Sequence, residues 1–235
     1  MTLNKINKLA IIALAPFLYL ASTGVSATPI EILNDTSFES AVSSQGSQTS
    51  WTSSAYGSWG VGDPLSTVSS APGISPLTGN KMLQFGTTGG SSSDIYQIVD
   101  VSGYATEIDA GLASVDLSIF FNAGSANSSM GLRLGGWTAA PTNFGGFTLL
   151  GGGFNNISIG GDGWEEFTVD DIQLTTGIRY LAFGIHEPTA LPLAYADDAS
   201  LKLTITSVPA PSSLVLMGLG LIGLRMIRRN HIGPG

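Results

Sequence analysis

The segment Ala113-Ser-Val-Asp-Leu-Ser-Ile-Phe-Phe121 carries the clearest periodicity in the chain. Every second side chain is apolar, namely Val115, Leu117, Ile119 and Phe121, and the polar side chains of Ser114, Asp116 and Ser118 share the other face. This period of two predicts a β-strand with one buried and one wet face, because successive side chains of a strand point to opposite sides. Residues Leu201 to Thr206 repeat the pattern, with the apolar side chains of Leu201, Leu203 and Ile205 on one side.

Shorter apolar runs, separated by Gly, Ser, Asn or Pro clusters, extend this pattern through the chain. They are Ile30–Leu33, Lys81–Phe85, Asp94–Val101, Met130–Leu134, Phe147–Leu150, Trp164–Val169 and Ile178–Ile185. The sequence has no amphipathic helix of comparable clarity. Because an antiparallel sandwich accommodates many short strands, we expect an all-β, antiparallel β-sandwich domain over residues 28–207.

The charges of the chain are few and unevenly placed. Of 235 residues, 11% are charged, 43% are hydrophobic and 31 are glycine, whereas about 25% charged residues are usual in a soluble domain. All 17 acidic residues lie within 28–207, together with four basic ones, so that this region has a formal charge of −13. This balance argues against nucleic acid as a partner, since phosphate binding requires clustered Lys and Arg. The absence of cysteine excludes disulfides and a thiol nucleophile.

Residues 1–27 have the three parts of a secretory signal peptide. Lys5 and Lys8 form a basic start, an apolar run follows, and Val25-Ser-Ala27 is a small-residue cleavage site. Cleavage after Ala27 is predicted, and the general secretory pathway is favoured because no pair of arginines precedes the apolar run. The alternative is an uncleaved anchor helix, for which the run is short.

Residues 208–230 combine a proline segment, an apolar segment and a basic segment. Val208 is followed by Pro209, Ala210 and Pro211, and the two prolines keep this part extended and accessible. The Gly-rich run over 214–224 is short, and predicts a marginal transmembrane segment. Three arginines would hold its far end on the cytoplasmic side, namely Arg225, Arg228 and Arg229.

This order of segments resembles the PEP-CTERM sorting signal of Gram-negative bacteria. The resemblance implies recognition by an exosortase, which is a membrane-embedded cysteine transpeptidase, transient anchoring in the inner membrane, and delivery to the cell surface or extracellular matrix. Ala210 stands in the middle of the Pro-x-Pro triplet, where the family name records Glu, so the chain departs from the pattern at that position. The alternative is a plain C-terminal membrane anchor.

Four short motifs between the two ends carry a second resemblance. They are Leu33-Asn-Asp-Thr-Ser-Phe-Glu39, Gly79-Asn-Lys-Met-Leu83, Ile95-Tyr-Gln-Ile-Val-Asp-Val101 and Tyr195-Ala-Asp-Asp-Ala-Ser-Leu201. Together they resemble the jelly-roll sandwich of carbohydrate-binding modules and galactose-binding-like domains, over residues 30–206. The resemblance implies a jelly roll that binds sugars.

The same resemblance implies a structural calcium ion that fastens the first strand to the last. Glu39 and Asp197 would supply carboxylates, and Asn80 and Lys81 would supply carbonyl oxygens, which are the hard donors that Ca²⁺ prefers. Asp197 shares the parity of the apolar side chains of Leu201 and Leu203, which predicts that its carboxylate points into the sandwich. The alternative is that both carboxylates are capped by backbone amides or face solvent.

Aromatic residues in a Ser- and Gly-rich stretch form a candidate glycan platform of Trp51, Tyr56 and Trp59. Exposed aromatic faces stack on sugar rings, but a tryptophan is also a common core residue, and that interpretation is open for each one. The glycine runs at 151–153 and 160–163 are interpreted as β-turns, because neither fits a phosphate-binding loop.

The sequence contains little that would serve catalysis, and no catalytic residue is assigned. His186 is the single histidine of residues 28–207, and a Ser-His-Asp triad would have to use it. The neighbouring carboxylates Glu165 and Glu166 would face opposite sides of a strand, whereas a glycosidase pair must converge.

The sequence therefore predicts a non-enzymatic, exported surface or matrix protein that binds extracellular polysaccharide or is embedded in it, as in a biofilm. One alternative is a purely structural envelope or matrix component without a sugar site. The other is a glycan-active enzyme whose activity would depend on Glu165 or Glu166.

Overall fold

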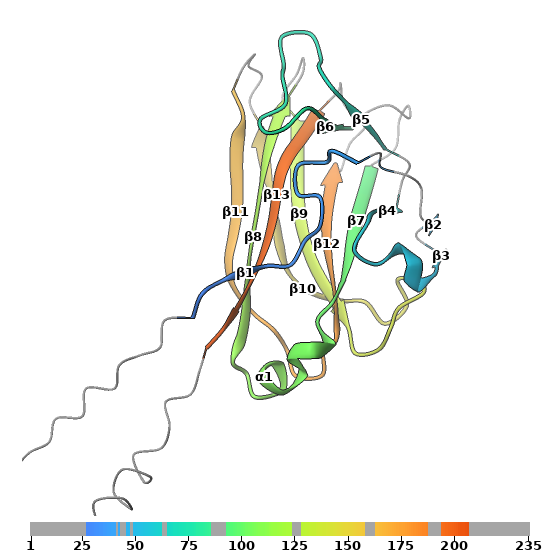
Figure 1. The fold of residues 1–235 in the computed structure, drawn as a ribbon, viewed down its shortest axis with the longest axis vertical. Helices are drawn as coiled ribbons and strands as arrows, with labels where there is room; N and C mark the ends of the chain where they lie inside the picture. The colour runs from blue at the N-terminus through green and yellow to red at the C-terminus, as the bar shows by residue number, and fades with distance from the viewer. Residues whose placement is uncertain are drawn as a thin grey trace, which may run out of the picture. The chain divides into compact units, whose positions relative to one another are not determined.

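The computed structural model describes residues 27–40, 42, 46–47, 49–62, 65–85, 93–123, 128–157, 163–187 and 194–206. Ser26–Val208 forms one compact unit, to which all of these residues belong. Its fold is drawn in Figure 1. The region assigned to the signal peptide, apart from Ala27, and the whole sorting tail lie outside the described residues.

The described chain is built from strands, with three short helical turns. The strands are β1 (Ile30–Glu31), β2 (Gly46–Ser47), β3 (Ser50–Trp51), β4 (Trp59–Gly62), β5 (Ser66–Val68), β6 (Met82–Gln84), β7 (Ser93–Asp100), β8 (Ala113–Ala123), β9 (Ser128–Trp137), β10 (Thr148–Ile157), β11 (Glu165–Gln173), β12 (Tyr180–Glu187) and β13 (Ala194–Ile205). The helical turns are η1 (Ser53–Ala55), η2 (Ser102–Tyr104) and α1 (Ala105–Asp109). A strand overlaps each of the segments in which the sequence predicts one.

The strands form two sheets that pack face to face. The six-stranded sheet has the order β11-β8-β13-β6-β5, with β1 beside β13, and the seven-stranded sheet has the order β10-β9-β12-β7-β4-β2-β3. All strand pairs are antiparallel except β2 with β4. The prediction of an antiparallel jelly-roll sandwich is confirmed.

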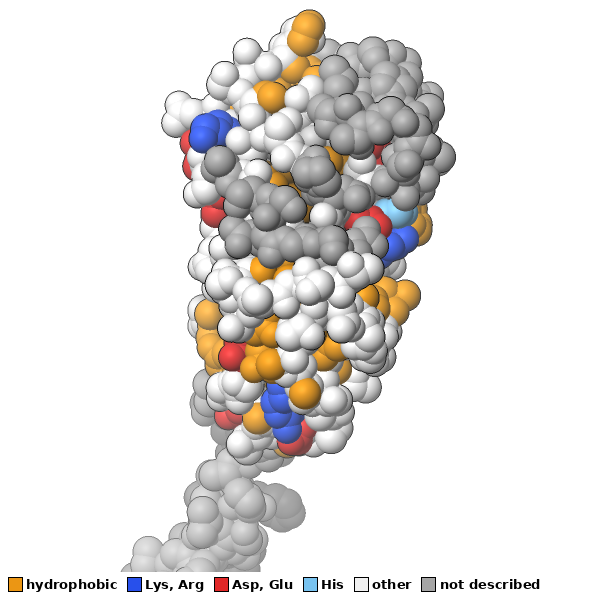
Figure 2. Space-filling model, turned by 90° about the vertical axis from the view of Figure 1, so that its right-hand side faces the viewer, with side chains coloured by type: hydrophobic (Ala, Val, Ile, Leu, Met, Phe, Trp, Pro, Cys, Tyr) orange, Lys and Arg blue, Asp and Glu red, His pale blue; other side chains and the backbone are white. Residues whose placement is uncertain are grey.

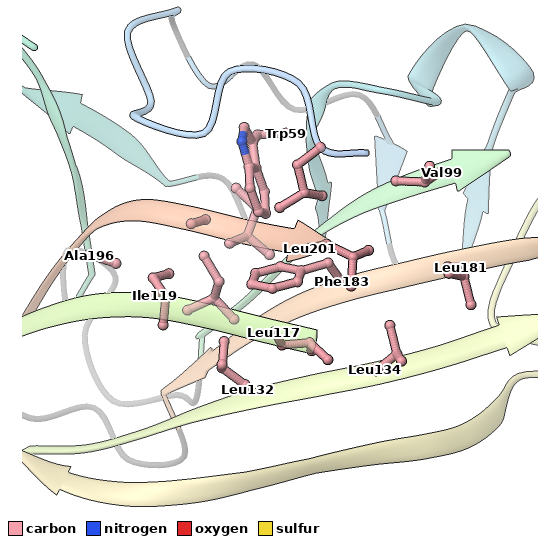
Figure 3. Packing of buried hydrophobic residues seen from close by; sticks show 14 of the residues in the cluster. Trp59, Val99, Leu117, Ile119, Leu132, Leu134, Leu181, Phe183, Ala196 and Leu201 are labelled. Carbon is pink, nitrogen blue, oxygen red and sulfur yellow. The ribbon is translucent and has the colours of Figure 1, made fainter. Parts of the chain in front are cut away.

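The period-two segments line the interior, as expected. The apolar side chains of Val115, Leu117, Ile119 and Phe121 in β8 are at most 1% exposed. Leu201 lies opposite Leu117 in β13, and from the other sheet Leu132 and Phe183 join the same core (Figure 3). Burial of each such side chain stabilises the fold by about 1.5–3 kcal/mol.

A β-bulge in β13 changes which face Asp197 occupies. Asp197 lies opposite Phe120, but Ser200 lies opposite Ser118, so the bulge adds a residue, and Asp198 has a positive φ of 52°. Ala196, opposite Phe121, points into the core, and Asp197 therefore points outward. The predicted inward orientation is wrong, because the parity of Leu201 does not carry across the bulge. Asp197 is nevertheless fully buried, under the turn of residues 77–81.

The two ends of the described chain meet near one end of the sandwich, which we call the terminal pole. Strand β1 pairs with the last part of β13, where Ile30 lies opposite Leu203. The first residues of β12 and the last residues of β9 lie at the same pole (Figure 1). Strand β12 runs away from this pole, so its last residues, His186 and Glu187, lie toward the opposite end.

Candidate functional site

The outward face of the seven-stranded sheet carries an apolar and a polar cluster of side chains. In β12 the side chains of Phe183 and Ile185 belong to the interior core, whereas Ala182 and His186 point outward. Ala182 belongs to an apolar cluster on this outward face, and His186 to a polar one. The clusters occupy different parts of the same face.

The apolar cluster fills the half of the face nearer the terminal pole with packed aromatic rings. Trp51 and Trp137 both lie edge-on or tilted against Phe144, with ring centroids 5.1 and 5.8 Å apart, and Phe147 packs 5.2 Å from Trp137. Gly135 lies under the Phe147 ring, and a Cβ there would overlap it. These rings are packed mainly on one another and leave little surface for a sugar.

The glycan platform predicted from Trp51, Tyr56 and Trp59 does not have the exposed faces that it requires. Trp51 and Trp59 are each 4% exposed. Trp59 lies inside the sandwich, packs on Phe183, and donates its indole N–H to the carbonyl of Asp35 at 2.9 Å. Tyr56 is half-buried, and its hydroxyl donates to the carbonyl of Pro141 at 2.7 Å. The exposure premise is wrong because the Ser- and Gly-rich segment folds back over the sheet.

The polar cluster lies farther from the terminal pole and joins four strands. His186 Nδ1 makes a short hydrogen bond with Asp94 Oδ1, and the same oxygen lies 3.9 Å from a guanidinium nitrogen of Arg133. The Phe154 ring packs edge-on against His186, with centroids 5.4 Å apart, and lies 5.9 Å from the Arg133 guanidinium carbon. Figure 2 shows the pale-blue imidazole beside acidic and basic side chains at the surface.

A groove of about 360 Å³ opens beside this cluster, along β9 and β10. Leu149 and Phe154 bound it as exposed apolar walls, the three glycines 151–153 lie between them, and Arg133 is its charged group. The polar cluster and this groove together are called the β10 groove below. Its combination of an aromatic ring, a guanidinium and a carboxylate–imidazole pair suits a polar ligand with flat apolar faces.

The glycines at the groove are required by the close approach of neighbouring atoms. At Gly152, φ is +139°, and a Cβ would lie 2.3 Å from the carbonyl oxygen of Leu132. At Gly131 a Cβ would lie 2.6 Å from the Phe154 ring. The interpretation of residues 151–153 as a β-turn is wrong, because these residues continue β10 across a bulge between Leu149 and Gly151. Most of the run at 160–163 lies outside the described residues.

Glu39 and Asp197 both hold the turn of residues 77–81 by accepting backbone N–H groups. Glu39 Oε1 accepts from Asn80 and Lys81 at 2.6 and 3.0 Å, and Lys81 Nζ donates to the Glu39 carbonyl at 2.6 Å. Asp197 accepts from Leu77, Thr78 and Asp198. The hydrogen bonds from the backbone N–H groups of Asn80 and Lys81 lower the pKa of Glu39. Burial raises the pKa of Asp197 to about 6, although the three N–H groups that it accepts lower its pKa in part.

This arrangement matches the amide-capping alternative more closely than the nominated calcium ligands. Asn80 and Lys81 direct N–H groups, which a cation would repel, at the Glu39 carboxylate. No group of three or more His, Asp or Glu able to hold a metal ion occurs in the described part of the chain. The amides already join the first segment to the last strand through this turn, and the calcium ion stays a prediction.

Glu187 is a buried carboxyl. It is 1% exposed, and in the described part of the domain neither carboxylate oxygen has a hydrogen-bond partner. Burial raises its pKa to about 7. It lies next to His186, opposite the buried Ser93, but on the interior side of β12. Such a group destabilises the fold when it ionises.

Sequence reasoning did not find Asp94, Arg133, Phe154 or Glu187. His186 was noted, but its partner follows only from the register that places it opposite Asp94. The signal available in the sequence was a charged residue within each of two apolar strands, Asp94 in β7 and Arg133 in β9. Glu165 is half-buried and Glu166 exposed on the opposite side of β11, as expected for neighbours in a strand.

The predicted processing residues lie outside the described residues, except Ala27. The undescribed ones are Val208, Pro209, Ala210, Pro211, Arg225, Arg228 and Arg229. In the described ranges there is no helix with the length and apolar character needed to cross a membrane. The predicted segment over 214–224 lies outside these ranges.

Comparison with known proteins identifies the tail and the fold. Residues 207–230 match the PEP-CTERM protein-sorting motif, which supports export and a C-terminal, membrane-anchored sorting step. No curated protein matches the chain.

Solved structures share the fold at low sequence identity. A protein from Bacteroides thetaiotaomicron, described as sugar-binding, is 12% identical over 74% of this chain and 99% of its own, with a TM-score of 0.50. A Stig cyclase from Fischerella sp. TAU is 12% identical over 77% of this chain and 100% of its own, with a TM-score of 0.51. A family 61 carbohydrate-binding module in complex with β-1,4-galactotriose is 18% identical over 58% of this chain and 80% of its own, with a TM-score of 0.40. At these identities the likeness is one of fold.

Proposed function

We propose that this chain is an exported, surface-sorted, non-enzymatic protein that binds extracellular polysaccharide through the β10 groove. The observation that carries the proposal is the exposed Phe154 ring, 54% exposed, beside the Arg133 guanidinium at the edge of a groove of about 360 Å³. The carbohydrate-binding proteins that share the fold support the choice of ligand class.

The chemistry of the groove suits a sugar ring. The apolar C–H face of a sugar can pack on Phe154, and Leu149 closes the other side of the groove. The Arg133 guanidinium makes no hydrogen bond with the described residues and contacts Asp94 only at 3.9 Å, so its N–H groups are available to sugar hydroxyls. The bond to Asp94 restricts the rotation of His186, on which the Phe154 ring rests.

The sorting tail supplies the proposed route to the polysaccharide. The general secretory pathway would export the chain, the tail would hold it briefly in the inner membrane, and an exosortase would release it to the cell surface or matrix. The described chain ends at the terminal pole, and His186 lies six residues along β12 from Tyr180 at that pole, which is about 20 Å of strand. The β10 groove would therefore lie away from the point where the tail begins.

Binding of purified polysaccharides tests the proposal. The full chain should sediment with insoluble extracellular polysaccharide, or shift its mobility in gels that contain a soluble one. Arg133→Ala should weaken this binding by about tenfold or more, because it removes the groove's charged donor. Thr168→Ala, at an exposed position of β11 on the other sheet, is the matched control and should bind normally.

Two outcomes would favour the other classes of protein. If no polysaccharide from a neutral and acidic panel is bound, or if Arg133→Ala and Thr168→Ala bind equally, the groove is not a sugar site and a purely structural matrix role is favoured. If the full chain releases reducing sugar, and Glu165→Gln or Glu166→Gln abolishes this release, the protein is a glycan-active enzyme.

A further inference from the structure

Strand β10 is a long sheet edge that carries no charged residue. It is the terminal strand of the seven-stranded sheet, spans ten residues, and contains neither Asp, Glu, Lys, Arg nor Pro. Charged residues and prolines usually keep an edge strand from pairing with another chain, and β10 has neither; the bulge between Leu149 and Gly151 is the one irregularity in its pairing with β9. The edge strand of the other sheet, β11, has this protection in Glu165, Glu166, Asp170 and Asp171.

This uncharged edge is also open and apolar. Each residue from Leu149 to Phe154 is exposed or half-exposed, whereas β9 beside it is largely buried. Leu149 is 64% exposed and Phe154 54%, and they are two of four large apolar side chains so exposed in the described part of the domain. From the interior side, Ile172 and Phe167 of β11 lie against Gly151 and Gly153 and support the strand.

The bulge in β10 makes this edge symmetric. Leu149 lies opposite Gly135 and Phe154 opposite Gly131, and both point to the outward face of the sheet. Between them the bulge adds Leu150 to the strand, so that Gly151, Gly152 and Gly153 alternate regularly in the middle. If Leu150 is set aside, Gly152 is the centre, and Leu149 and Phe154 are equally far from it on the same face.

We propose that two copies of this chain associate by antiparallel pairing of their β10 edges, with a two-fold axis at Gly152. In this register Leu149 of each copy lies opposite Phe154 of the other, and Gly151 lies opposite Gly153. Every pair has both side chains on the same face, as antiparallel pairing requires. The two contacts are identical, as in any closed two-fold interface.

The charge of the domain favours a second copy at this edge over other parts of its surface. Residues 28–207 carry a formal −13, so that two copies repel each other over most approaches. Along β10 this repulsion is weaker, because the strand itself carries no charge. Pairing would also place the two β10 grooves side by side across the axis.

A pair of cysteine substitutions tests the register directly, because the chain has no cysteine of its own. In Leu149→Cys/Phe154→Cys, each new thiol would face a thiol of the other copy, where Cβ atoms lie about 4.5–5.5 Å apart. Within one copy the two positions are separated by about five residues of strand, or ~16 Å, which no disulfide can bridge. The double variant of the full chain, exported to an oxidising compartment, should give a covalent dimer on non-reducing gels.

The two single cysteine variants are the controls for disulfides that form when two copies collide in other orientations, for example through the apolar segments at either end of the chain. Leu149→Cys alone and Phe154→Cys alone should give at least tenfold less covalent dimer, since like positions are far apart in this register.

Leu149→Lys should weaken the non-covalent dimer in analytical ultracentrifugation by about tenfold or more, and Thr168→Lys on the other edge should not. Equal cross-linking of single and double variants, or a monomeric full chain in detergent, would overturn the proposal. Arg133→Ala separates this inference from sugar binding, because it should leave the cross-link intact.

Discussion

Replacement of the buried Glu187 by Gln should stabilise the protein at neutral and alkaline pH. The carboxyl is 1% exposed, neither of its oxygens has a hydrogen-bond partner among the described residues, and burial raises its pKa from 4.5 to about 7. A raised pKa means that the folded state binds the proton more tightly than the unfolded state. This group therefore lowers the free energy of unfolding as pH rises from about 4.5 to about 7, and its effect is constant above that range.

The size of the effect follows from the shift in pKa. The rise in the pKa of Glu187 from 4.5 to about 7 corresponds to a loss of about 3 kcal/mol in the free energy of unfolding once the carboxyl is ionised. This is the largest effect expected, because Glu187 lies at the end of its strand. Gln has nearly the same shape and cannot ionise. Glu187→Gln should therefore raise the free energy of unfolding by about 2–3 kcal/mol near pH 8 and change it little near pH 4.

Urea unfolding followed by tryptophan fluorescence measures this difference, because Trp51, Trp59 and Trp137 are buried in the native state. Wild type, Glu187→Gln and the surface control Glu166→Gln should be compared across the range from about pH 4 to pH 8. An equal gain at both ends of this range would refute the reasoning, since it would assign the effect to packing rather than ionisation. The absence of any gain near pH 8 would do the same.

Four further outcomes are expected. Asp197→Ala should lose about 1–3 kcal/mol of stability in the same urea assay, unlike Glu187→Gln, because three backbone N–H groups would lose their acceptor. Gly152→Ala should lower stability by at least about 1–3 kcal/mol, since it adds an atom 2.3 Å from a carbonyl oxygen at a positive φ. If calcium is a structural ion, chelator treatment should lower the melting temperature in calorimetry and added Ca²⁺ should restore it; an unchanged value would remove calcium from the structure. Mass spectrometry of the extracellular protein should find a chain that begins at Thr28 and lacks Arg228 and Arg229, whereas an intact tail would contradict sorting.

The parts of the fold that follow from side-chain periodicity were predictable from the sequence. Val115 to Phe121 and Leu201 to Ile205 alternate without interruption, and both strands are buried as expected. Asp197 shows where this reasoning stops. A bulge moves every residue before it to the opposite face of the sheet from the one that the alternation predicts. The positive φ of Asp198, which belongs to this bulge, is not marked by a glycine in the sequence.

The candidate site was less predictable because it depends on register. His186, Asp94 and Phe154 are far apart in the sequence, and only the pairing of β12 with β7 and β9, and of β9 with β10, brings them together. The tryptophans predicted as a sugar platform, Trp51 and Trp59, are buried, whereas Phe154, which no sequence pattern marks, is exposed. The tail, by contrast, was recognisable because its proline, apolar and basic parts follow one another directly.

The pairing of β1 with the end of β13 has a mechanical consequence. Because Ile30 lies beside Leu203, the first and last described strands begin and end at neighbouring points of the domain. If the chain is pulled between its two ends, the force enters at these neighbouring points and opens the β1–β13 pairing from one end, one hydrogen bond after another, instead of shearing many hydrogen bonds at once.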